Sequence, residues 1–530
     1  MSSFDNILWN KSKYQSLEQQ QQQNTNYVNG NSQSIITLLL IGLLGTAVIT
    51  TMWSIHSPTK ATIFLIDTKL PMLHKTSTRF LSFGLDSSLL RDPKTLPINN
   101  EAFMNLAKYL SPAYARIGGT SADCIFFKQN SDDISRTYDK FDPNDITNFT
   151  LTEEFYLNLY KFTEKSKLKM LFDLNVMIRT DQNEWNSSNA KDIIEFSKGH
   201  SMDIDWQLGN EPNSFKHVFN RSISATQLAH DYQHLRNLLN DIGYSSSILV
   251  GPETNHIGDS NERGEMYTEE FLKNQDNCID FVTWHQYYLN GRIAKVDDFI
   301  NPKVFNQLSA EIKQINNATK NSGKNIKMWI SETSTAYGGG APNLSDRFAG
   351  TFLWLDKLGY SASVGVDVVI RQSLFGGNYA MIGNDLLPNP DWWISVLYKQ
   401  FVSEIVLDLK TPNNFGTLRF YAHCTAKLGL VNRLPALTIY GMNLDNKPKN
   451  IFIQGNWIKK KTNIFLYILT ADDLTSREIK LNGEKLKLNS DGSLPPFNPV
   501  IIKPTQMITL PPISMAFIVI HGADIPPCRS

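Results

Sequence analysis

The stretch DWQLGNEPNSF, residues 205–215, joins a short apolar strand to a turn that carries a charged residue. Gly209 ends the strand, Asn210 and Glu211 follow it, and Pro212 stiffens the next step of the chain. Asn, Gly and Pro are turn residues in their own right, so a lone Asn-Glu-Pro predicts no more than a turn. The stretch gains a chemical meaning only if a second carboxylate follows another strand in an equivalent place.

Short apolar runs that end in polar residues recur between residues 79 and 400. The eight runs are RFLSFGLD (79–86), AYARIGG (113–119), KMLFDLN (169–175), DIDWQLGNE (203–211), SILVGPE (247–253), DFVTWHQ (280–286), IKMWISE (326–332) and VDVVIRQ (366–372). Helix-like segments separate most of them, at 101–110, 189–199, 224–241 and 302–322. This alternation predicts an α/β fold, a (β/α)8 TIM barrel over residues 79–403. A doubly wound sheet is the alternative, but no Gly-rich dinucleotide fingerprint follows the first strand.

Glu211 ends the fourth of these strands and Glu332 ends the seventh. The carboxyl ends of barrel strands converge on one mouth, where the active sites of such barrels lie. Two carboxylates facing each other there indicate glycoside hydrolysis, in which one protonates the leaving oxygen and the other attacks the anomeric carbon. Asn210 is then placed to bind the sugar 2-hydroxyl. For either glutamate alone, the alternative is an ordinary ion pair with Arg116 or Arg371.

The composition limits the class of protein. A chain of 530 residues is too long for one ordinary domain. Its 51 basic and 51 acidic residues give a formal net charge of 0, so no nucleic-acid partner is expected. Four cysteines without a CxxC pair, and no His/Cys cluster at metal spacing, predict neither a zinc site nor a disulfide-dense domain. We expect no metal and no other cofactor, and the oligomeric state is left open.

The first 60 residues differ from the rest of the chain. Residues 1–34 include a glutamine run and little apolar content, which predicts a disordered polar tail. Residues 35–53, IITLLLIGLLGTAVITTMW, carry no charge and have about the length that crosses a bilayer. They predict a transmembrane signal anchor, with a cleaved signal peptide and a secreted product as the alternative.

Later features favour a lumenal or extracellular body. Five Asn-x-Ser/Thr sequons follow the apolar run and are candidate glycosylation sites, at Asn148, Asn186, Asn220, Asn317 and Asn343. Two late cysteines, Cys424 and Cys528, also suit an oxidising compartment. The chain is therefore expected in the secretory pathway, in a lysosome or at the cell surface.

After about residue 405 the helical periodicity fades. The runs TLRFYAHCTA (417–426), ALTIYGMNL (436–444) and FIVIHG (517–522) alternate as sandwich strands do. We therefore expect a β-sandwich domain over residues 404–530.

Long motifs resemble those of the heparanase family from about residue 75 to the C-terminus. They are FDLNVMIRT (172–180), QNEWNSSNA (182–190), WQLGNEPNSF (206–215), VTWHQYYLNGR (282–292), WISETSTAYGGGAPNLSDRFAGTFLWLDKLG (329–359) and GGNYAMI (376–382). Heparanases are retaining endo-β-glucuronidases built from a (β/α)8 barrel and a β-sandwich. The resemblance implies that Glu211 is the acid/base, that Glu332 is the nucleophile, and that Asn210 matches the family as well.

The resemblance extends to the substrate cleft and to the sandwich. It implies sugar contacts from Asp86 and Thr120, residues that flank the nucleophile at His285 and Tyr287, and a cradle for the uronic carboxylate from Tyr337, Gly338, Gly339, Gln372, Gly377 and Tyr379. Glycine backbone N–H groups suit an anion because no side chain blocks the approach. It further implies that a strand at 61–78 joins the sandwich and that Cys424 and Cys528 form a disulfide. Cys124 and Cys278 are expected to be free buried thiols.

Two departures from the family bear on the substrate. Residues 131–154 hold seven acidic and two basic residues, and residues 252–270 hold six acidic and one basic, where the family has basic heparin-binding clusters. Ser121 stands at a cleft position where the vertebrate enzymes carry Lys. The expected substrate is heparan sulfate or a related glucuronic-acid glycan, and an unsulfated or short one is an alternative. An inactive glycan-binding relative of the heparanase-2 type and a membrane-tethered adhesion protein are the remaining alternatives.

Overall fold

A computed structural model of the chain describes residues 61–66, 72–128, 145–261, 263–411, 415–432, 434–455, 457–458, 462–523 and 525–529. The predicted tail at 1–34 and the predicted anchor at 35–53 lie outside these ranges. Within them, no helix has the length and apolar character needed to cross a membrane.

Eight parallel strands form the barrel, as the strand-and-helix alternation predicts, and the doubly wound alternative is wrong. The strands are β3 (Leu81–Asp86), β4 (Tyr114–Gly118), β7 (Lys169–Leu174), β8 (Ile204–Leu208), β9 (Val250–Thr254), β10 (Phe281–Gln286), β12 (Met328–Thr333) and β14 (Val368–Arg371). Their order in the sheet is β8-β7-β4-β3-β14-β12-β10-β9. The two end strands are linked by a single bridge between Trp206 and Leu249, where the Trp206 N–H donates to the Ile248 carbonyl at 2.9 Å.

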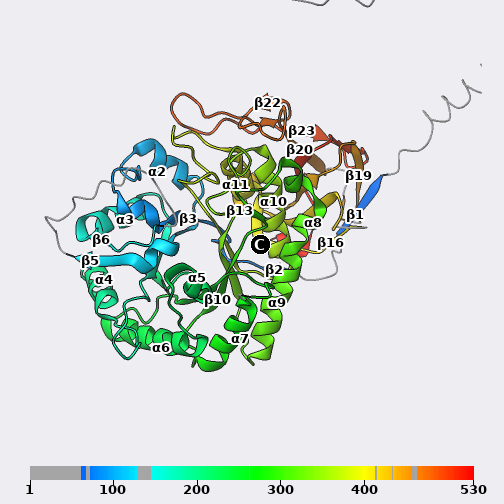
Figure 1. Ribbon diagram of the computed structural model, residues 1–530. Helices are drawn as coiled ribbons and strands as arrows, with labels where there is room; N and C mark the ends of the chain where they lie inside the picture. The colour runs from blue at the N-terminus through cyan, green and yellow to red at the C-terminus, as the bar shows by residue number, and fades with distance from the viewer. Residues whose placement is uncertain are drawn as a thin grey trace, which may run out of the picture. The chain divides into compact units, whose positions relative to one another are not determined.

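Helices surround these strands (Figure 1). They are α2 (Glu101–Lys108), α3 (Glu153–Lys165), α4 (Ser188–Gly199), α6 (Ala225–Ile242), α7 (Gly264–Asn274), α9 (Gln307–Asn321), α10 (Phe348–Ser363) and α11 (Pro390–Phe401), with the short α5 (Phe215–Phe219) and α8 (Pro302–Phe305). Several begin at a side-chain cap; the Ser224 hydroxyl, for example, accepts from the Gln227 N–H at 3.1 Å. The single helix expected at 302–322 is split at Asn306, whose amide bonds Arg419 and the Phe415 carbonyl instead.

The interior of the barrel changes in character from one end to the other. Toward the amino ends of the strands it is apolar, with a cluster that includes Tyr114, Leu171 and Trp329. Toward the carboxyl ends the buried residues are polar or charged, among them Arg116 and Glu332. Strands of a parallel sheet are covered on both faces and are therefore usually apolar throughout. Polar and charged residues at the carboxyl ends of these strands depart from that pattern, which indicates a functional site.

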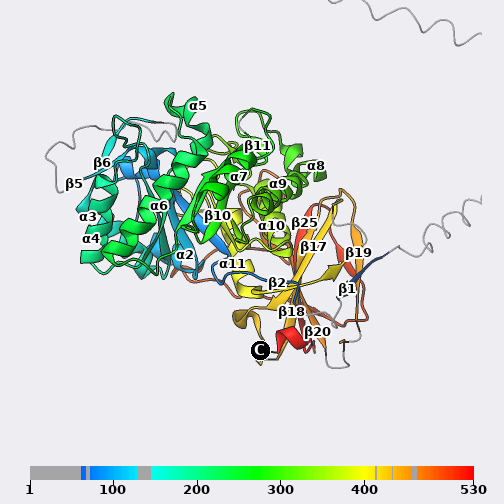
Figure 2. The same ribbon diagram turned by 90° about the horizontal axis from the view of Figure 1, so that it is seen from below.

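Two layers form the sandwich, one antiparallel and one mixed. One is built mainly from five strands in the order β15 (Val402–Leu407), β17 (Leu418–Thr425), β18 (Ala436–Asn443), β25 (Ser514–His521) and β20 (Asn463–Thr470), of which Figure 2 labels the last four. The other contains β16 (Leu409–Lys410), β1 (Thr62–Ile66), β19 (Lys449–Gln454) and β24 (Ile508–Leu510). Side chains from both layers, such as Phe64, Ile451 and Ile518, share one core.

The N-terminal segment pairs with the sandwich as expected, but as two strands rather than one. β1, blue in Figure 1, runs parallel to β19 and antiparallel to β16. β2 (His74–Lys75) pairs with β15 in the other layer. The sandwich begins at Val402, directly after α11, two residues before the expected boundary.

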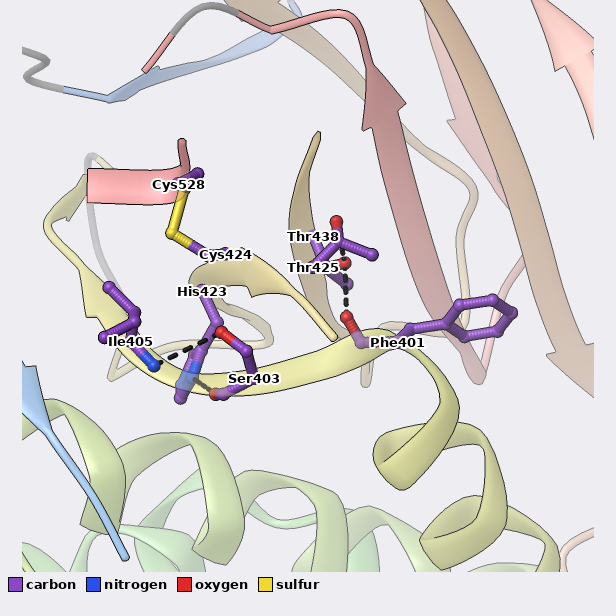
Figure 3. Close-up of a disulfide and its surroundings, with 8 residues drawn as sticks. All are labelled: Phe401, Ser403, Ile405, His423, Cys424, Thr425, Thr438 and Cys528. Carbon is purple, nitrogen blue, oxygen red and sulfur yellow. Dashed lines mark hydrogen bonds between the residues drawn. A yellow bond between two sulfur atoms is a disulfide. The ribbon is translucent and has the colours of Figure 1, made fainter. Parts of the chain in front are cut away.

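A disulfide joins Cys424 of β17 to Cys528 in a short 3-10 helix (Pro526–Cys528), across a sequence separation of 104 residues (Figure 3). Around it, the Thr438 hydroxyl donates to the Phe401 carbonyl at 2.7 Å. The crosslink therefore fastens the C-terminal end of the chain to a central strand of the larger layer. Cys124 and Cys278 are buried and free.

Candidate active site

Glu211 leaves strand β8 through an unusual backbone turn. Gly209 has φ 82° and Glu211 itself lies in the left-handed region, at φ 58° and ψ 52°. A non-glycine residue is uncommon there and is held by its surroundings. The Glu211 N–H donates to the Glu253 carbonyl at 3.1 Å, and Pro212 begins a 3-10 turn (Pro212–Ser214). The Asn-Glu-Pro segment is thus a turn, as its composition predicts, and it also brings the Glu211 carboxylate to the barrel mouth.

Glu332 lies on β12 and is almost completely buried. Its Oε2 accepts from Arg116 Nη1 at 2.7 Å, and its Oε1 accepts from the Tyr287 hydroxyl at 2.7 Å. Burial alone would raise the pKa of the Glu332 carboxyl, but the positive charges of His285 and Arg116 outweigh it and lower this pKa below its ordinary value. Glu332 is therefore held as the anion.

The two glutamates meet at His285. The His285 Nδ1 lies 2.8 Å from Glu211 Oε1, and its Nε2 lies 2.9 Å from Glu253 Oε2. One carboxylate oxygen of Glu211, one of Glu332 and a ring nitrogen of His285 all lie within 4.8 Å of one another. Retaining glycosidases hold their two carboxyl groups about 5–5.5 Å apart, so this spacing fits direct attack by one of the pair.

Arg116 connects the residues of the site. Its guanidinium is buried and donates to Glu332, to Gln207 Oε1 at 2.9 Å, to Asn210 Oδ1 at 2.9 Å and to Glu253 Oε2 at 3.2 Å. The Arg116–Glu332 ion pair that the sequence offers as an alternative to catalysis is therefore real. It keeps the anion in place and does not remove it from the cleft.

Three further buried acids surround this centre. Burial raises the pKa of Asp86 to about 6 and that of Asp123 to about 7, and burial together with the neighbouring Asp123 raises the pKa of Asp173 well above its ordinary value. The Asp123 carboxylate accepts from the Asn210 N–H at 2.9 Å, and Asp86 accepts from Gln372 Nε2 at 2.7 Å. At acidic pH these side chains are predominantly neutral, so the positive charges of Arg116 and His285 are balanced by the glutamates of the site.

A cleft of about 600 Å³ opens above the two glutamates. Nine of the eleven residues proposed for substrate binding line it, namely Asp86, Thr120, Asn210, His285, Tyr287, Tyr337, Gly338, Gly339 and Tyr379. Gln372 does not, because it is buried beneath Asp86, and Gly377 packs against Tyr379 from outside the lining.

The expectation that Ser121 occupies the cleft is wrong. It is fully buried in a 3-10 turn (Thr120–Cys124), where its hydroxyl accepts from Arg91 Nε at 3.2 Å and donates to the Asp145 carbonyl at 3.1 Å. The turn exposes Thr120 to the cleft and directs the next side chain inward. Serine in place of lysine at this position therefore changes buried contacts with Arg91 and Asp145, and it does not change the charge of the cleft lining.

Several residues of the site are missing from the sequence-based selection. Arg292, Glu311, His217 and His256 line the cleft, and nothing in their local sequence distinguishes them from surface residues. Arg116 and Glu253 are different, because the sequence marks both as polar residues near the carboxyl ends of barrel strands, β4 and β9, without giving either one a substrate contact.

In the part of the chain that the structure describes, Glu211, His285 and Glu332 form a group whose ligand atoms are close enough together to hold a metal ion. Glu332 is already bound by Arg116 and Tyr287, and His285 lies between two carboxylates. Charge balance in the group is thus supplied by protein side chains, which fits acid–base chemistry. At the surface, all five sequon asparagines are exposed.

Comparison with known proteins gives a consistent result. Glycosyl hydrolase family 79, N-terminal domain, matches residues 86–359. A heparanase of Bos taurus is 33% identical over 500 residues, which cover 86% of this chain and 91% of that protein. An inactive heparanase-2 of Mus musculus is 30% identical (88% and 90% covered), and a hyaluronoglucuronidase of Hirudo nipponia is 31% identical (86% and 97% covered). A solved 4-O-α-L-rhamnosyl-β-D-glucuronidase of Fusarium oxysporum, 14% identical, aligns over 86% of this chain and 99% of its own with a TM-score of 0.64, which shows the fold alone.

Proposed function

The chain belongs to glycosyl hydrolase family 79, and on this premise we propose that it hydrolyses β-glucuronidic bonds with retention of configuration, with Glu211 as acid/base and Glu332 as nucleophile. The observation that carries the proposal is the pair of carboxylates within 4.8 Å at the barrel mouth. One of the two, Glu332, is held as an anion by Arg116, as a nucleophile requires.

The chemistry proceeds in two displacements. Glu332 attacks the anomeric carbon while Glu211 gives its proton to the glycosidic oxygen, so that one C–O bond forms as the other breaks. The departing chain leaves as an alcohol and the glucuronyl group is bound to Glu332 as an ester. Glu211, now a carboxylate, takes a proton from water, and this water attacks the same carbon and releases Glu332. The Tyr287 hydroxyl, whose pKa burial raises well above its ordinary value, stays protonated and supports the Glu332 anion.

Substituting the two glutamates tests the proposal. We expect Glu332→Gln and Glu211→Gln each to lower kcat on an aryl β-glucuronide by about three orders of magnitude or more with little change in the unfolding temperature, since both lie at the cleft. Azide should restore turnover to Glu332→Ala by replacing the missing nucleophile. The first-formed sugar, followed by NMR, should be the β anomer. Wild-type rates in either Gln variant, or the α anomer appearing first, would contradict the assignment.

The substrate is a glucuronic-acid glycan. Tyr337, Gly338, Gly339 and Tyr379 all line the cleft, and we assign the binding of the uronic carboxylate to them. Gly338 and Gly339 adopt φ 73° and 85°, and a side chain added at either would meet no atom within 4 Å, so their backbone N–H groups are open to an anion. The names of the relatives, heparanase and hyaluronoglucuronidase, support this class of substrate.

A glycan-binding role without turnover is the second candidate, because one relative is an inactive heparanase-2. The presence here of both carboxylates and of Asn210 favours the enzyme. Binding of heparosan with no detectable release of reducing ends would favour the second candidate.

Residues 35–53 are proposed to anchor the enzyme in a membrane with its body on the lumenal or extracellular side. Their uncharged apolar composition and the exposed sequons after them support this placement. The protein should then remain in the pellet after a carbonate wash and carry endoglycosidase-sensitive glycans. A soluble product that begins after Trp53 would show instead that the segment is a cleaved signal.

A further inference from the structure

Glu253 is a charged residue that has no role in the two-carboxylate mechanism proposed above. It lies on β9, is completely buried and does not line the cleft, so it does not touch the substrate. An isolated buried carboxylate is strongly unfavourable, and it persists only where partners compensate for its lost hydration. The position therefore calls for an explanation in terms of its neighbours.

Three donors converge on one oxygen of Glu253. Its Oε2 lies 3.2 Å from Arg116 Nη2, 2.8 Å from the Ser331 hydroxyl and 2.9 Å from His285 Nε2. Burial alone would raise the pKa of this carboxyl, but Arg116 and His285 outweigh it and lower the pKa below its ordinary value. Glu253 is therefore an anion, and an anion facing Nε2 keeps a proton on that nitrogen.

The opposite ring nitrogen of His285 faces Glu211. With Nε2 committed to Glu253, the ring plane is fixed and Nδ1 lies 2.8 Å from Glu211 Oε1. The charged groups around the ring are Glu211, Glu253, Glu332, Arg116 and the more distant Asp173. Burial disfavours a positive ring, but the surrounding carboxylates raise the pKa of His285 to about 10, so both nitrogens donate in the working range of pH.

We propose, on the basis of the function proposed above, that Glu253 is a positioning residue that acts on the acid/base through His285. An Nδ1–H directed at Glu211 Oε1 leaves Oε2 as the oxygen that carries the transferable proton. In the first step this selects the productive form of the acid, and after proton transfer the same N–H stabilises the new carboxylate. The sequence Glu211···His285···Glu253 thus extends the acid/base into the barrel interior.

The test compares substrates that differ in their need for an acid. Glu253→Gln keeps the shape of the side chain and removes its charge. We expect it to lower kcat/KM by about 10- to 100-fold for a glucuronide with a poor leaving group and by less than about 3-fold for an aryl glucuronide whose phenolate leaves without a proton. The alkaline limb of the pH profile should move to lower pH by about one unit or more, because His285 loses an ionic partner.

Two further variants separate positioning from packing. Ser331→Ala removes a hydrogen bond to the same Glu253 oxygen and leaves the carboxylate charge in place, so it should affect both substrates equally and leave the alkaline limb unmoved. Glu253→Asp keeps the charge and should restore the alkaline limb. In the double variant Glu253→Gln with His285→Gln, the loss should not exceed that of His285→Gln alone, since both act on one path.

Equal losses on both substrates with an unchanged pH profile would show that Glu253 serves packing only, and the proposal would be wrong. If Glu253→Gln does not fold, the pH profiles of Glu253→Asp and His285→Gln are compared instead. The proposal expects the alkaline limb to stay in place in Glu253→Asp and to move in His285→Gln, and an unmoved limb in both would contradict it. Failure of the proposed function is recognised separately, since the wild-type enzyme would then give an inverted product or no turnover on either glucuronide.

Discussion

At the scale of single residues, the site depends on how a few buried charges are balanced. Arg116 and His285 supply positive charge to Glu332, Glu253 and Glu211, while Asp86, Asp123 and Asp173 stand close by. Not all of these acids can be ionised together in a buried site, and burial assigns the proton to the three aspartates. The result is an anionic Glu332, the proposed nucleophile, inside a group of acids whose charge depends on pH.

This arrangement predicts a pH-dependent stability that is specific to Asp86. Its pKa is about 6 in the folded protein against 3.8 ordinarily, so between these values the folded state binds more protons than the unfolded state. The contribution of Asp86 to stability therefore falls as pH rises from about 4 to about 6 and is constant above. Relative to the wild type, Asp86→Asn should gain on the order of 3 kcal/mol of unfolding free energy between pH 4 and pH 7.

Urea unfolding of both proteins at the two pH values measures this difference. A hydrogen bond lost by the Asn side chain shifts the comparison equally at every pH, so the slope isolates the titration. Asp181→Asn, at an exposed position, is the control and should show a flat difference. A flat difference for Asp86→Asn as well would contradict a buried carboxyl that titrates near neutrality.

At the scale of elements, the sequence predicts strands better than the contacts between them. Six of the eight barrel strands lie within a run recognised by its apolar residues, and β9 and β12 extend one residue beyond theirs; Glu211 and Glu332 fall near strand ends as expected. The break at Asn306 and the burial of Ser121 could not be foreseen, because both depend on partners distant in sequence, Arg419 and Arg91. The pairing of Arg116 with Glu332, although the two lie 216 residues apart, is different: the sequence offers it as an alternative, because both residues belong to strands of the predicted barrel.

Helix α10 gives a prediction at this scale through Gly359. A Cβ added there would lie 2.0 Å from the Tyr421 ring of β17, whose hydroxyl donates to Asp356 on the same helix at 2.6 Å. Helix propensity alone favours Ala over Gly by about 1 kcal/mol. Overpacking costs about 1–3 kcal/mol or more, so Gly359→Ala should lower the unfolding temperature despite the better helix former.

Gly199, at the end of α4, is the matched control. A Cβ added there meets no atom within 4 Å, so Gly199→Ala should leave stability unchanged or slightly raised. Differential scanning calorimetry of the two variants decides the matter. A stabilised Gly359→Ala protein would mean that α10 and β17 are not packed as described.

At the scale of the whole molecule, zero net charge hides a local excess of acid near the substrate. The loop that contributes Asn255, His256 and Asp259 to the cleft belongs to the stretch 252–270, which has six acidic residues and one basic. Among the residues that the structure describes, Arg292 is the only arginine or lysine that lines the cleft. A highly sulfated chain would meet repulsion here, over the 8–10 Å or so that charges reach at physiological salt.

We therefore expect faster cleavage of desulfated heparosan than of highly sulfated heparin. The measurement is a panel of substrates that also includes chondroitin, hyaluronan and an aryl β-glucuronide. Added salt should raise kcat/KM for the sulfated chain, because screening weakens repulsion, whereas steering by a basic cleft would be weakened instead. Asp259→Asn should narrow the gap between heparosan and heparin about two- to fivefold, a change of under 1 kcal/mol that suits one exposed charge. Asp472→Asn, an equally conservative change in the sandwich, should leave the gap between heparosan and heparin unchanged. Fastest cleavage of the most sulfated polymer, falling with salt, would show that attraction from elsewhere on the enzyme overrides the acidic loop.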